Sequence, residues 1–255
     1  MPDRFGPRGV FAVMIPRQNS NMQPEYQAMC PPGVSNQMYR FDVSNQEEVP
    51  EALIREVEHT LGCWPDMVIC GNAVEMRDWS IAKHAEYHRQ IAEKIPGIPF
   101  VTATDACTAA LRTIGAKRLG VLSPMTPELA KSATDFYEEL GFEVPYSTWL
   151  KADESIDIIN ISREAVDAAF DRLDHEGVDT FLHIGGALGI LDRIDDLEKR
   201  LGRPVISICA CTYWYALRKH GITDPFNLGG KITRMQLPEE FAYTGLAGEL
   251  ASCSA

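Results

Sequence analysis

The chain has 255 residues, 45% of them hydrophobic, and a formal net charge of −12 at pH 7. This length and apolar content are sufficient for one large packed domain or two small ones. The acidic balance argues against nucleic acid or an anionic membrane surface as a partner, and no apolar run is long enough to cross a bilayer.

Short apolar runs alternate with helical periods along the first half of the chain. We expect strands at residues 9–16, 38–43, 66–70 and 98–104, and helices at residues 47–61, 79–95 and 105–114. A polar loop, residues 17–25, follows the first strand. Strands that alternate with helices are typical of a parallel sheet.

The same pattern begins again at Arg118. We expect strands at residues 118–123, 144–149, 180–184 and 204–212, helices at residues 128–140, 162–176 and 190–201, and a last helix that runs through Arg218. The repeat predicts an α/β protein with two similar lobes and a cleft between them. Residues 1–115, completed by residues 213–255, would form the first lobe, and residues 116–212 the second.

Two of the predicted strands end in cysteine. Cys70 ends the strand at residues 66–70, and Gly71 beside it lets a ligand approach the backbone closely. Cys209 lies in the strand predicted at residues 204–212. Because ligands of open α/β sheets bind outside the carboxyl ends of the strands, we expect Cys70 and Cys209 to face each other across one active site. Cys211 competes with Cys209, since both would point to the same face of a strand.

The polar loop at residues 17–25 has two interpretations. Its amides and hydroxyl, Asn19 among them, are well placed to donate hydrogen bonds to a ligand carboxylate. The alternative is an Asx-type turn with solvated side chains, which the spacing alone favours.

The seven cysteines lack CxxC spacing or a compact framework, and residues 1–6 show no signal-peptide pattern. We therefore expect reduced thiols and a cytoplasmic protein. His84 and His88 lie one helical turn apart without a third ligand nearby in the sequence, and Cys209 and Cys211 are too close together for the usual zinc site. We expect no metal and no cofactor, and there is no GxGxxG or Walker motif to support a nucleotide.

Several segments, in order, resemble the maleate isomerase and arylmalonate decarboxylase branch of the Asp/Glu racemase superfamily. The opening signature of that branch, Pro-x-x-Asn-x-x-Met-x-Pro-Glu, reads here Pro16, Asn19, Met22, Pro24 and Glu25. The resemblance continues at Cys70-Gly71-Asn72, at residues 186–192 and 197–207, at Cys209 and in the helix with Trp214 and Arg218.

The resemblance implies two Rossmann-like lobes with parallel sheets, related by pseudo-two-fold symmetry, and an active site in the cleft between them. It implies cysteine chemistry on a small carboxylic acid without a cofactor, in a chain that is often a homodimer or higher homo-oligomer in this family. Racemases and maleate isomerases use two cysteines, here Cys70 and Cys209, which favours an isomerase or racemase. Backbone donors at Gly71, Asn72, Ala210 and Cys211 would hold the substrate.

Two alternatives stay open. Arylmalonate decarboxylases resemble this chain as well, but they have glycine at the first cysteine position and use the second cysteine, here Cys209, as proton donor. A non-catalytic carboxylate-binding protein would keep the fold without the chemistry. Met125 replaces a tyrosine that is usual in the family, and Ala187 replaces an asparagine of the isomerases. Both departures predict a more apolar pocket, suited to a monocarboxylate or an acid with an apolar substituent.

Overall fold

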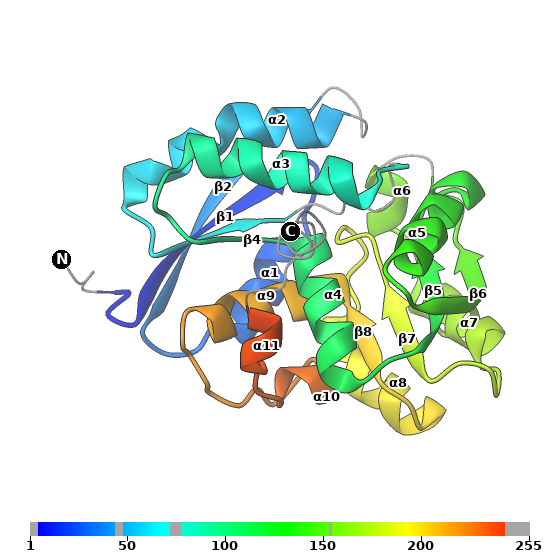
Figure 1. Ribbon diagram of the computed structural model, residues 1–255. Coiled ribbons are helices and arrows are strands. Elements are labelled where there is room, and N and C mark those ends of the chain that lie inside the picture. Colours follow the sequence, from blue (N-terminus) through cyan, green and yellow to red (C-terminus); the bar gives the residue numbers. More distant parts are fainter. Residues whose placement is uncertain (1–4, 44–47, 72–77, 153–154, 243–255) are drawn as a thin grey trace.

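Within residues 5–43, 48–71, 78–152 and 155–242, which the computed structural model describes, two parallel sheets of four strands form the core (Figure 1). The first has the order β2-β1-β3-β4, with β1 (Gly9–Pro16), β2 (Val34–Phe41), β3 (Met67–Cys70) and β4 (Phe100–Thr102). The second has the order β6-β5-β7-β8, with β5 (Arg118–Ser123), β6 (Glu143–Trp149), β7 (Thr180–His183) and β8 (Val205–Ser207). The second order repeats the first when counted from β5, which confirms the predicted α/β fold with two similar lobes.

Helices cover both faces of the first sheet (Figure 1). They are α1 (Met22–Met29), α2 (Val49–Glu56) with the 3₁₀ helix η2 (Val57–Cys63), α3 (Ile81–Lys94) and α4 (Ala103–Ile114). Side chains alternate between the faces of a strand. Thus Met14 and Val68 pack toward α2 and α3, while Val13 and Ile69 belong to the core on the other face.

The second half of the chain contributes α5 (Pro127–Glu139), α6 (Ser155–Ile159), α7 (Arg163–Leu173), η4 (Leu191–Arg193), α8 (Ile194–Leu201) and α9 (Ile208–Lys219), followed by α10 (Gly230–Thr233) and α11 (Glu239–Ala242). Every residue of α9 from Ile208 to Arg218 is buried. A helix that is buried all round lies inside the molecule rather than on its surface. Accordingly, α9 packs against both α4 and α1 of the first lobe.

The structure corrects four of the predicted boundaries. The strand expected at residues 204–212 ends at Ser207, and α9 begins at Ile208. The loop expected at residues 17–25 contains the start of α1, because the Oδ1 atom of Asn19 accepts the backbone N–H groups of Asn21 and Met22 at 2.9 and 3.0 Å. The second strand occupies Val34–Phe41, and the helix expected at residues 47–61 continues beyond α2 as the 3₁₀ helix η2.

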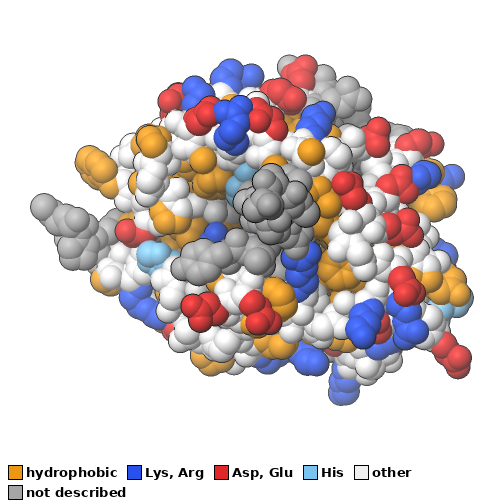
Figure 2. All heavy atoms as spheres, in the orientation of Figure 1, with side chains coloured by type: hydrophobic (Ala, Val, Ile, Leu, Met, Phe, Trp, Pro, Cys, Tyr) orange, Lys and Arg blue, Asp and Glu red, His pale blue; other side chains and the backbone are white. Residues whose placement is uncertain are grey.

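The surface and the thiols agree with the composition. Among the described residues on the face in Figure 2, acidic and basic side chains are interspersed. None of the described helices combines the length and the apolar composition that a membrane crossing requires. All six cysteines in the described part of the chain are free thiols, as predicted, and Cys253 lies outside it.

Arg218 provides a test of how the C-terminal segment is held on α9. Its buried guanidinium donates to the backbone carbonyls of Ile222, Asp224, Thr233 and Met235, at 2.7 to 3.1 Å. We predict that Arg218→Ala lowers the free energy of unfolding by about 2–4 kcal/mol, because these carbonyls lose a charged donor. Urea unfolding followed by circular dichroism measures this. The exposed Arg55→Ala serves as control and should leave the midpoint unchanged; an equal loss in both variants would contradict the prediction.

Candidate active site

Cys209 lies in the first turn of α9 and lines a small cavity that both lobes enclose. The cavity has an empty volume of about 190 Å³, which includes space open to solvent. Residues from both lobes line it: Met22, Tyr26, Gly71, Ala103, Gly186, Ile208, Cys209 and Thr212. The first turns of α4 and α9 therefore meet at the cavity. Because helix N-termini favour negative charge, this arrangement suits a carboxylate.

Two glycines lie in the cavity wall at positions where a larger side chain would clash with its neighbours. A Cβ atom at Gly71 would lie 2.2 Å from Cε of Met22 and 2.9 Å from the carbonyl oxygen of Met14. A Cβ atom at Gly186 would lie 3.2 Å from Sγ of Cys209. The structure thus places Gly71 in the same wall as Cys209, and its contact with a ligand stays a prediction.

The expectation that Cys70 faces Cys209 is wrong. Cys70 is fully buried in the apolar layer between the first sheet and helices α2 and α3, whereas Cys209 belongs to the core on the other side of that sheet. Successive residues of a strand point to opposite faces, so Cys70 points away from the side that Gly71 occupies. Burial raises the pKa of the Cys70 thiol, and the carboxylate of Asp105 raises it further. Cys70 is a neutral core thiol outside the cavity.

Cys211 and Ala210 are also absent from the cavity wall, because this segment is helical rather than extended. Two residues along a helix correspond to a rotation of about 200°, so Cys211 points away from Cys209. The Sγ atom of Cys211 lies 3.4 Å from Sγ of Cys107 in the core. Helical geometry therefore separates two cysteines that a strand would have kept on one face.

Of the other residues predicted to bind the substrate, Asn19 and Met125 do not line the cavity. The buried amide of Asn19 binds backbone. Its Oδ1 atom accepts the N–H groups of Asn21 and Met22, and its Nδ2 atom donates to the carbonyl oxygen of Gly186 at 3.1 Å. The turn agrees with the Asx-type alternative, but the side chain is buried and bonds across to the second lobe instead of being solvated. Met125 is buried in the core and is not part of the cavity wall. Asn72 lies outside the described residues.

Glu25 is a buried carboxyl next to Cys209 that the sequence argument did not assign to the site. Its Oε1 atom accepts the backbone N–H groups of Ile190 and Leu191 at 3.0 and 2.9 Å. Its Oε2 atom has no hydrogen-bond partner among the described residues. Burial raises the pKa of Glu25, and the hydrogen bonds from Leu191 and its neighbours offset part of that effect. Its place in the signature, directly after Pro24, was the one signal in the sequence.

The surroundings of Cys209 keep its thiol protonated. Burial raises its pKa well above the usual value, and the charge of Glu25 raises it further. The Sγ atom donates to the carbonyl oxygen of Gly186 at 3.4 Å. A neutral thiol is a proton donor, whereas a nucleophile or base requires the thiolate. Before a substrate binds, the Cys209 thiol is thus protonated and can act as a proton donor.

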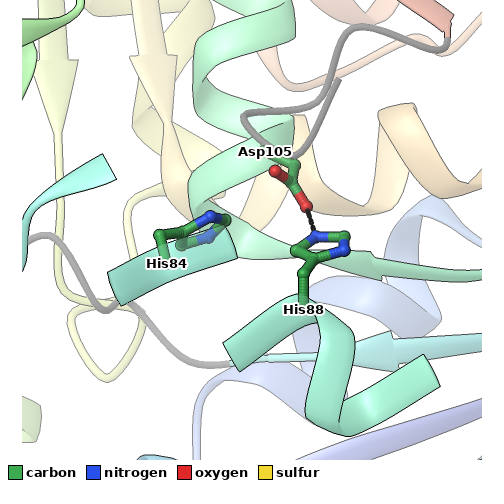
Figure 3. A group of neighbouring side chains, drawn as sticks. All are labelled: His84, His88 and Asp105. Carbon is green, nitrogen blue, oxygen red and sulfur yellow. Dashed lines mark hydrogen bonds and ion pairs between the residues drawn. The ribbon is translucent and has the colours of Figure 1, made fainter. Parts of the chain in front are cut away.

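A third potential ligand for His84 and His88, which their surroundings in the sequence do not offer, comes from another helix. Asp105, in the first turn of α4, reaches the two imidazoles of α3, and the three potential ligand atoms lie within 4.8 Å of one another (Figure 3). No spacing rule points to Asp105, because β4 and a loop separate it from α3 in the sequence. None of the three lines the Cys209 cavity.

The fold and the cavity define a class of protein: two α/β lobes with equivalent sheets and a cysteine at the start of a helix between them. The model of the arylmalonate decarboxylase family matches residues 80–232, which is more than half of the chain. The chain belongs to this family.

Relatives with assigned reactions fall into two groups. A maleate isomerase from Alcaligenes faecalis is 25% identical over 139 residues, which are 54% of this chain and 55% of that protein. The chain therefore matches about half the length of its curated relatives. The solved maleate cis-trans isomerase of Nocardia farcinica has a TM-score of 0.79 at 20% identity, covering 88% of this chain and 97% of that one. A crystal structure of arylmalonate decarboxylase has a TM-score of 0.74 at 18% identity, covering 88% and 98%.

The pKa of Cys209 gives a direct prediction. Because its pKa is raised, the rate at which iodoacetamide alkylates Cys209 should still be rising with pH above the range in which ordinary thiols level off.

Glu25→Gln keeps an acceptor for Ile190 and Leu191 but removes the negative charge. We predict a lower pKa and at least about threefold faster alkylation at pH 8, measured by mass spectrometry of the Cys209 peptide. The exposed Glu93→Gln is the control, and an unchanged or slower rate in Glu25→Gln would contradict the assignment.

Proposed function

We propose that this chain is an enzyme that acts on a small carboxylic acid without a cofactor and that Cys209 is its proton donor. The observation that carries the proposal is the position of one neutral thiol, alone among the described cysteines, in a cavity where two helix N-termini meet. The combination offers a proton and a binding place for negative charge. Those are the two requirements for protonating the carbanion of a carboxylic acid.

Decarboxylation of a substituted malonate is the reaction that this site supports best. The bond from the α-carbon to one carboxylate breaks, carbon dioxide leaves, and the electron pair delocalises into the remaining carboxylate as an enediolate. The Cys209 thiol then transfers its proton to the α-carbon, and solvent reprotonates the thiolate. A single thiol is enough for this sequence. By resemblance, the decarboxylases have glycine in place of the first cysteine. Here Cys70 occupies that position but lies outside the cavity, which again leaves Cys209 as the one thiol among the wall residues.

The wall also suggests how the acid is bound. Met22, Ala103 and Ile208 present apolar surface, which suits an apolar substituent. Tyr26 is fully buried in the wall, and its hydroxyl has no hydrogen-bond partner among the described residues. A buried hydroxyl without a partner is costly unless a ligand supplies one. We propose that Tyr26 donates to the substrate carboxylate, in place of the family tyrosine that Met125 replaces.

The curated relatives favour a second candidate, cis–trans isomerisation of a maleate-like acid. A cysteine-to-serine mutant of the Nocardia farcinica isomerase has been solved with a covalently bound succinylcysteine intermediate. In the maleate isomerases, by resemblance, the first cysteine makes this addition. Because Cys70 lies outside the cavity here, Sγ of Cys209 would have to join to one carbon of the double bond, with the thiol proton going to the other carbon. Rotation about the new single bond and elimination would then give the trans acid.

Replacement of the cysteines tests the role of Cys209, and the product formed separates the two functions. We predict that Cys209→Ser lowers kcat on alkyl- or arylmalonates by at least about 10³-fold, because the hydroxyl is a much weaker acid. Cys70→Ser and Cys211→Ala should retain most of the activity, since both thiols lie outside the cavity. Carbon dioxide release measures turnover. Conversion of maleate to fumarate with a Cys209 adduct would assign the isomerase instead, and full activity in Cys209→Ser would overturn both.

The role of Tyr26 has its own test. Tyr26→Phe keeps the ring and removes only the hydroxyl, so we predict a KM raised by roughly tenfold with a smaller change in kcat. Steady-state kinetics on the same malonate gives both constants. Tyr137→Phe, a buried tyrosine outside the cavity wall, is the matched control. An unchanged KM in Tyr26→Phe would remove Tyr26 from the binding site.

A further inference from the structure

Three potential metal ligands converge between α3 and α4, outside the Cys209 cavity. His84 and His88 lie one turn apart on α3, so both imidazoles point to the same side, and Asp105 approaches them from the first turn of α4 (Figure 3). Their ligand atoms lie within 4.8 Å of one another. His84 is fully buried, Asp105 is 3% exposed, and the side chain of His88 is 18% exposed. The exposed edge of His88 gives an ion a route into the site.

The hydrogen bonds within this cluster leave one nitrogen of His84 without a partner among the described residues. Asp105 forms an ion pair with His88 and accepts the hydroxyl of Thr102 at 2.7 Å. The Nε2 atom of His84 lies 3.4 Å from that same hydroxyl. The Nδ1 atom of His84 has no hydrogen-bond partner within the described residues, although the side chain is buried. Buried polar atoms are normally paired, so an unpaired nitrogen on a buried imidazole of this cluster points to a missing partner for His84.

Two imidazole nitrogens and one carboxylate oxygen form a ligand set typical of first-row divalent metals. Zinc takes three such protein ligands at about 2.0–2.2 Å and keeps one position for water. Ligand atoms around such an ion are separated by about 3.4 Å. The present separations require modest side-chain rotations, with the direct contact between His88 and Asp105 opening to admit the ion.

We propose that His84, His88 and Asp105 form a binding site for one divalent transition-metal ion, with Zn²⁺ as the best match. The ion would fasten α3 to the N-terminus of α4. Thr102 and Ala103 connect this site to the active site, because Ala103 lines the cavity and Thr102 precedes it. The ion would stabilise the packing of α3 against α4 beside the cavity and would not take part in the reaction. The inference does not depend on the proposed function.

The test measures metal binding by the intact chain. After removal of metals with EDTA, titration calorimetry with Zn²⁺ should give one ion per chain, and the unfolding midpoint should rise with saturating Zn²⁺. We expect His88→Gln and Asp105→Asn each to weaken binding by at least about 100-fold. His59→Asn is the control, because His59 is an exposed histidine paired only with Glu56 among the described residues, and it should bind Zn²⁺ like the unaltered chain.

Cobalt distinguishes this site from the thiols. The Co²⁺-loaded chain should show ligand-field absorption without a thiolate-to-cobalt charge-transfer band, and Asp105→Asn should abolish that absorption. Absence of Zn²⁺ binding at 100-fold excess over the folded chain would overturn the proposal. So would binding that survives both His88→Gln and Asp105→Asn, or a charge-transfer band from cysteine. His88 is partly exposed, so its variant keeps the test valid if the change at buried Asp105 prevents folding.

Discussion

The structure depends on the burial of α9 between the two lobes. Strand β8 ends at Ser207 and α9 begins at the next residue, so the strand of the second lobe leads directly into a helix that packs on α1 and α4 of the first. An all-round apolar helix can only be accommodated where elements surround it. Its N-terminus then has to lie where the lobes meet, and its second residue is Cys209. Packing, rather than a loop, thus places the Cys209 thiol at the cavity.

The segment that begins α1 holds the opposite wall of the cavity. Asn19 donates to Gly186, and Glu25 accepts from Ile190 and Leu191, all in the second lobe. Hydrogen bonds to a charged group each contribute about 1.5–3 kcal/mol, so the two bonds that Glu25 accepts hold the two lobes together beside the cavity. The same carboxylate of Glu25 raises the pKa of Cys209. One residue therefore joins the lobes and adds to the effect of burial, which is the main cause of the raised pKa of the Cys209 thiol.

Much of the fold follows from the sequence because its signals are local. Apolar runs and helical periods predicted both sheets, and the helix expected from residue 162 begins there because Ser162 accepts the N–H of Ala165. The start of α9 was missed because residues 204–212 are apolar throughout. A continuous apolar run reads equally as a buried strand or a buried helix.

The candidate site was only partly predictable, since its geometry is set by tertiary contacts. Cys209 and Gly71 were found from strand ends, but pairing Cys70 with Cys209 ignored the alternation that turns Cys70 to the other face. Glu25 and Asp105 acquire their roles from neighbours in other parts of the chain, Cys209 and His88. No periodicity or spacing contains that information, and only the packed structure brings these groups together.

The central claim is that Cys209 alone, and not Cys70, meets the substrate. Its most direct test is alkylation by bromoacetate, which carries the carboxylate of the proposed substrates, at alkaline pH with and without excess malonate, followed by peptide mass spectrometry. The account predicts modification of Cys209, slowed by malonate, with Cys70 unmodified in the folded chain. Modification of Cys70 while Cys209 stays free would contradict it.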